Sequence, residues 1–175
     1  MENPHHEPQS QTISATQDSI AAPNLLPADQ TELAVLTQRL NSAASWFYVL
    51  AALSVVNSLI ATFGGTIRFI FGLGITSVVD AIIAGTEVGA AGTIISLVFT
   101  LAMAGLFVVF GFLSKKGYHW AFIIGMVIYL LDGLLLLLPG DYLGAAFHAY
   151  VLFRLYQGLA ASRKLSELKQ NQSAI

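Results

Sequence analysis

The chain has 175 residues, of which 55% are hydrophobic and 10% are charged, and its net charge at pH 7 is −2. An ordinary soluble domain is excluded because about 25% of its residues would be charged, and a nucleic-acid partner would need a basic surface. The absence of cysteine excludes disulfide bonds, thiolate metal ligands and cysteine nucleophiles. We therefore expect one all-α integral membrane domain whose first partner is the lipid bilayer.

The N-terminal part of the chain is polar. Residues 1–28 contain four of the five prolines and almost no large apolar side chain, so we predict a disordered tail without a cleavable signal peptide. Asp29, followed three residues later by Glu32, resembles a helix-capping pattern. Leucines at helical spacing follow it. The sequence therefore predicts a short amphipathic helix over residues 30–41, lying at the membrane interface and ending at Asn41-Ser42.

Four apolar segments follow that are suited to cross a bilayer, which requires about 20 residues. The first of them begins with aromatic side chains typical of the headgroup region. The segment over residues 93–113 carries a stripe of small residues, which predicts a face for close helix packing. The spans are expected over residues 43–63, 93–113, 120–138 and 142–161, and the stripe comprises Thr93, Ser96, Thr100, Ala104 and Gly111.

Residues 69–84 form a shorter apolar segment that contains Asp80. As a helix this segment would measure about 24 Å, against a hydrocarbon core of roughly 30 Å. A four-span topology places Asn57, Asp132 and His148 in the same half of the membrane, whereas a fifth span would separate Asn57 from the other two. We favour four spanning helices plus a short re-entrant or interfacial helix, and five spanning helices remain the alternative.

Basic residues indicate the orientation. Lys115-Lys116 and Arg163-Lys164 are separated by two spans, so both pairs lie on one side of the membrane. Because cytoplasmic loops carry an excess of Lys and Arg, that side is expected to be the cytoplasm. The bundle would then occupy residues 29–162, and residues 163–175 would form a cytoplasmic polar tail. The side on which the N-terminus lies stays open.

Four polar residues are expected within the membrane: Asn57, Asp80, Asp132 and His148. A charge at the bilayer centre costs roughly 2.5–3.5 kcal/mol on insertion scales, so such side chains should face protein or water. Asp132 shares a helix face with Ala121, Gly125 and Tyr129. Asp132 and His148 lie at comparable distances from the turn at Pro139-Gly140, and this spacing predicts that they are neighbours.

Two interpretations of this cluster stay open. It is either a hydrogen bond or ion pair that fixes helix packing, or a proton or cation site formed by Asp80, Asp132 and His148. Metal binding is undetermined. No dinucleotide-binding loop, serine-hydrolase elbow or zinc-protease motif occurs, so neither a cofactor nor a catalytic residue is expected.

Several runs resemble small multi-pass membrane proteins of bacteria that carry no assigned activity. The resemblance covers about residues 40–162 and implies a bacterial inner membrane as the location. We expect a non-enzymatic protein that acts by association, as a homo-oligomer or with other membrane subunits. A small proton or cation transporter is the alternative, and an intramembrane enzyme comes third. The runs are Trp46-Phe47-Tyr48, Gly72-Leu73-Gly74-Ile75-Thr76 before Asp80, and Gly125-Met126 with Leu131-Asp132-Gly133-Leu134.

Overall fold

The computed structural model describes residues 27–63, 74–85 and 89–173. The predicted disordered tail over residues 1–28 lies outside this part of the chain, apart from its last two residues, where the first helix begins. Within the described ranges all regular secondary structure is α-helix, which confirms the predicted all-α fold. The helices are α1 (Pro27–Thr62), α2 (Gly74–Ala84), α3 (Gly89–Lys115), α4 (His119–Leu135) and α5 (Tyr142–Ser173).

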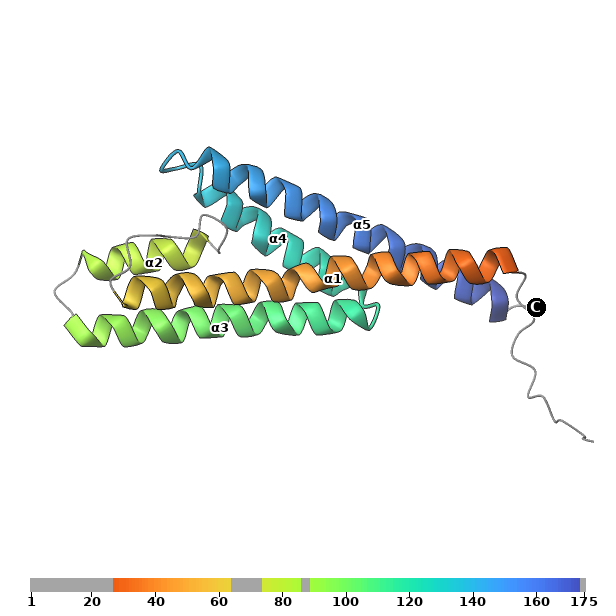
Figure 1. The fold of residues 1–175 in the computed structure, drawn as a ribbon, viewed down its shortest axis with the longest axis horizontal. Coiled ribbons are helices and arrows are strands. Elements are labelled where there is room, and N and C mark those ends of the chain that lie inside the picture. Colours follow the sequence, from red (N-terminus) through yellow and green to blue (C-terminus); the bar gives the residue numbers. More distant parts are fainter. Residues whose placement is uncertain (1–26, 64–73, 86–88, 174–175) are drawn as a thin grey trace, which may run out of the picture.

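Helix α1 is the centre of the arrangement. It runs beside α3 along most of its length and also packs against α5, while α4 packs against α5 (Figure 1). The short helix α2 contacts α1, α3 and α4. Helices α1 and α5 both extend beyond the other helices at the end of the bundle where α5 finishes (Figure 1). The helices are therefore spread furthest apart at the end where α5 begins, and at the other end only α1 and α5 continue (Figure 1).

Helix α1 is continuous, so the predicted end of a helix at Asn41-Ser42 is wrong. Asn and Ser lower helix propensity only modestly, and no glycine or further proline occurs between Pro27 and Thr62. The buried face also continues without interruption through Leu40, Ala43 and Ala44. Tertiary packing on both sides of this point therefore carries the helix through it, and residues 30–41 are its first turns.

Helix α5 also extends further than expected. The polar segment predicted over residues 163–175 is helical as far as Ser173. Leu165 is buried and Leu168 packs against the core, and Lys164 forms an ion pair with Glu32 of α1. The apolar contacts and the ion pair with α1 explain why this polar sequence stays helical.

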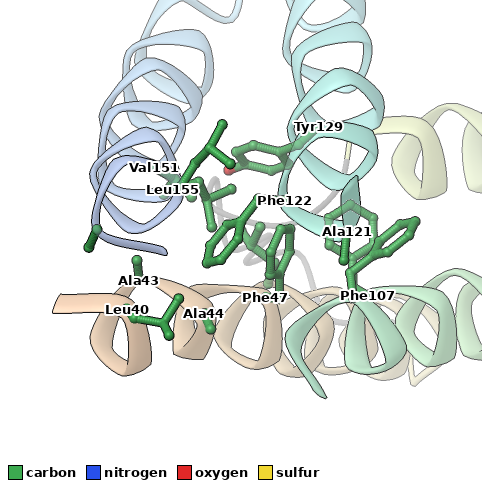
Figure 2. Packing of buried hydrophobic residues seen from close by; sticks show 14 of the residues in the cluster. Leu40, Ala43, Ala44, Phe47, Phe107, Ala121, Phe122, Tyr129, Val151 and Leu155 are labelled. Atoms are coloured by element: carbon green, nitrogen blue, oxygen red, sulfur yellow. The ribbon is translucent and has the colours of Figure 1, made fainter. Parts of the chain in front are cut away.

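Aromatic rings fill the centre of the bundle. Phe47 on α1 is fully buried, and its ring centroid lies 6.0 Å from those of Phe107 and Phe122 (Figure 2). A Cβ atom at Gly125 would come within 2.6 Å of the Phe47 ring, so this glycine allows α4 to approach α1. Ala121, Gly125, Tyr129 and Asp132 are all buried, which confirms the predicted interior face of α4.

Two of the described helices are long and apolar enough to cross a membrane, over Asp29–Ile60 and Ala91–Lys115. Helix α4 is apolar but has 17 residues. Helix α2 has 11 residues, about 16 Å, or half of a hydrocarbon core. Length and composition thus mark two helices, α1 and α3, as candidate membrane spans.

Candidate functional site

Asp132 and His148 meet inside the bundle, which confirms that they are neighbours. Asp132 projects from α4 and His148 from α5, and His148 Nε2 lies 2.8 Å from Asp132 Oδ2. The two side chains belong to residues that are 3% and 1% exposed. The tight turn between the helices depends on Gly140, whose φ of +79° favours glycine. This turn sets the two helices antiparallel and brings the two residues to the same depth.

Asp132 has further partners that the sequence did not reveal. The backbone N–H of Gly74 donates to Oδ2 at 2.8 Å, and that of Ile75 donates to Oδ1 at 2.7 Å. These are the first residues of α2, whose N–H groups have no partner within their own helix. A carboxylate is favourable there because the helix dipole places positive charge at this end. Asp132 therefore joins α2, α4 and α5.

The hydrogen bonds of His148 define the proton content of the pair. Nδ1 lies 2.9 Å from the carbonyl oxygen of Gly144, and because a carbonyl can only accept, Nδ1 carries a proton. One further proton then lies between Nε2 and Asp132. Whether this proton is bound to His148 Nε2 or to Asp132 Oδ2, the pair has no net charge. A neutral pair costs less free energy to bury than a single charge.

Tyr129 covers the pair from one side. Its ring stacks on the His148 imidazole, with centroids 4.2 Å apart and planes 16° apart. Tyr129 is fully buried, and its hydroxyl group has no hydrogen-bond partner among the described residues. Gly133 permits the close approach of α5, since a Cβ atom there would lie 2.9 Å from His148 Cβ. The His148 side chain therefore packs closely against α4.

The remaining predicted members of the cluster stay predictions. Asn57 is buried on α1, and Asp80 lies on α2, although its side chain is outside the described part of the structure. Among the described residues, no group of three or more His, Asp or Glu side chains could hold a metal ion.

Comparisons with protein-family models, with curated proteins and with solved structures find no match. The resemblance to small bacterial membrane proteins accordingly stays a prediction.

Replacing Asp132 with Asn should loosen α2. One amide oxygen cannot accept from both Gly74 and Ile75 while the amide nitrogen faces His148, so a buried N–H loses its partner at a cost of about 1–3 kcal/mol. We expect hydrogen exchange at the backbone amides of residues 74–76 to accelerate, while α3 stays protected. Asp29→Asn removes the same charge from the exposed first turn of α1 and is the control. Unchanged exchange in α2 would contradict this role of Asp132.

Proposed function

We propose that the chain is a non-enzymatic integral membrane protein that acts by association, as a homo-oligomer or as a subunit of a membrane complex. The observation that carries the proposal is the reversed distribution of side chains on α3. Its small polar residues Ser96 and Thr100 are buried, whereas Ile94 and Val98 are 63% and 60% exposed. A protein surrounded by water would bury the larger apolar side chains, and membrane bundles use small residues between helices.

The same reversal extends to the other helices. Ser54 and Ser58 of α1 are buried, and the hydroxyl of Ser54 donates to the carbonyl of Leu50. Leu130, Leu131 and Leu134 on α4 are exposed. In water this surface would be unfavourable by about 25 cal/mol for each Å² of apolar area. Lipid or a partner helix removes that cost, which supports both the location and the mode of action.

The small-residue stripe of α3 does not supply the association surface. Ser96, Thr100, Ala104 and Gly111 face the interior, whereas Thr93, the first residue of the predicted stripe, is exposed. A Cβ atom at Gly111 would come within 3.0 Å of the Tyr48 ring of α1. The stripe is therefore a packing face within one chain. The surface available to other subunits is the opposite, apolar side of α3 together with the outer side of α4.

The proposed topology has four spans, α1, α3, α4 and α5, with α2 as a re-entrant helix. Its length of 11 residues supports this choice over five spans, and so does the attachment of its N-terminus to Asp132. Residues 142–161 of α5 would cross the membrane, and the polar remainder of the helix would lie in the cytoplasm. The resemblance noted above favours a bacterial inner membrane.

A reporter fused after Ile175 tests the orientation. Lys115, Lys116 and Lys169 line one groove, so the basic residues of α3 and α5 lie at the same end of the bundle, as the positive-inside rule requires. With the C-terminus in the cytoplasm, we expect a fluorescent protein fused there to fluoresce and a periplasmic phosphatase fused there to be inactive. The opposite pattern would overturn the topology.

Cross-linking of single cysteines tests association, and the cysteine-free chain provides a clean background. Val98→Cys places a thiol on the outer side of α3, and Ala104→Cys places one on its buried side. If copies associate through the outer side, only Val98→Cys should give a disulfide-linked dimer in native membranes. Absence of a cross-link at this and other outer positions, together with a monomeric mass in nanodiscs and no co-purifying subunit, would contradict the proposal.

A second candidate is proton or cation transfer through Asp132 and His148. The observation that favours it is the contact of three titratable side chains, because Tyr129 stacks on His148 and His148 bonds Asp132. Reconstituted protein would then conduct protons along an imposed pH gradient. Asp132→Asn should abolish this flux and Asp29→Asn should leave it unchanged, as measured with a pH-sensitive dye inside liposomes. Native protein that gives no flux above empty liposomes would reject this candidate.

A further inference from the structure

A basic groove lies between α1 and α5, away from the Asp132–His148 pair. It has a volume of about 570 Å³. Three cationic side chains line it, Arg39 from α1 and Arg154 and Lys164 from α5, and no acidic side chain does so among the described residues. Amide and hydroxyl groups add hydrogen-bonding capacity. These are Gln38, Ser42 and Gln157.

The three cationic side chains of this groove differ in the ion pairs and hydrogen bonds that they form within the chain. Lys164 is paired with Glu32. Arg154 donates from Nη2 to Ser42 Oγ at 3.3 Å, and its Nε is buried without a hydrogen-bond partner among the described residues. Arg39 is exposed and forms no ion pair within the described part of the chain. Neither guanidinium group has an acidic partner among the described residues, and both line the groove, so their charge suits an anionic ligand.

The groove lies beside aromatic residues typical of the membrane interface. Trp46 and Tyr150 form an edge-to-face pair with centroids 5.6 Å apart, one helical turn from Ser42 and Arg154. Trp46 lies near the start of the span expected over residues 43–63, where such residues occur at the level of the lipid headgroups. Phe153 and Tyr156 flank the groove and are largely exposed, so they offer apolar surface to an acyl chain. A phosphate group at this level belongs to a lipid.

We propose that the groove between α1 and α5 binds the phosphate group of an anionic membrane lipid through Arg39 and Arg154. Guanidinium groups suit this ligand because their N–H donors match two phosphate oxygens at once. Glu32 neutralises Lys164, so Arg39 and Arg154 supply the uncompensated charge. The inference rests on the proposed membrane location but is independent of whether the protein associates or conducts protons.

Native mass spectrometry of the detergent-solubilised full chain tests the site. Titration with phosphatidylglycerol should give bound lipid at lower concentrations than titration with phosphatidylcholine, whose headgroup has no net charge. Arg39→Gln and Arg154→Gln should each weaken phosphatidylglycerol binding about fivefold. Arg163→Gln removes the same charge from a neighbouring exposed position outside the groove, so it should change binding less than about twofold.

Three outcomes would overturn the proposal. One is equal retention of both lipids, and another is an equal effect of the groove variants and Arg163→Gln. The third is displacement of the lipid by millimolar inorganic phosphate, which would assign the groove to a soluble phosphate compound. Arg39 is exposed, so its variant should fold even if Arg154→Gln does not. Recovery of the fluorescent fusion in the membrane fraction tests the membrane location separately.

Discussion

The carboxylate of Asp132 holds the polar interior of this bundle together. It accepts from two backbone N–H groups that begin α2 and shares a proton with His148 of α5. In a bilayer no water replaces a lost partner, and each unsatisfied backbone group costs several kcal/mol. Helix α2 is short, so its unpaired terminal groups are a large fraction of its hydrogen-bonding groups. The position of α2 therefore depends on Asp132 of α4. The charge of Asp132 is in turn compensated by His148 of α5, which shares a proton with it.

Close packing around this carboxylate depends on glycine and on small side chains. A Cβ atom at Gly74 would lie 2.7 Å from the side chain of Leu136, and one at Gly133 would lie 2.9 Å from His148 Cβ. At Gly158 the added atom would meet Ala43 of α1. Helices in lipid gain little from burying apolar surface against each other, so they associate through close backbone approach and interhelical hydrogen bonds. The Asp132–His148 pair supplies the hydrogen bonds between helices, and the small residues allow the close approach that these bonds require.

The sequence predicted the pairing of Asp132 with His148 because a short turn fixes the depth of the residues on both of its sides. It could not predict the bonds from Gly74 and Ile75, since the place of a short helix is set by tertiary contacts rather than by its own pattern. The false helix end at Asn41-Ser42 had a similar cause. Local propensity there is weak, and the buried face that overrides it is visible only once α5 lies against α1.

The two polar regions differ in the hydrogen-bonding capacity that they leave unused. Both oxygens of Asp132 and both ring nitrogens of His148 have partners, so conduction through the pair would require breaking bonds that position α2. The side chains of Arg39 and Arg154 line an open groove, and neither forms an ion pair with a described acidic residue. A group whose bonds are all made within the chain contributes to architecture, and a group with spare donors at the surface can bind something else. That contrast supports a stabilising role for the interior pair and is consistent with the ligand recognition proposed for the groove between α1 and α5.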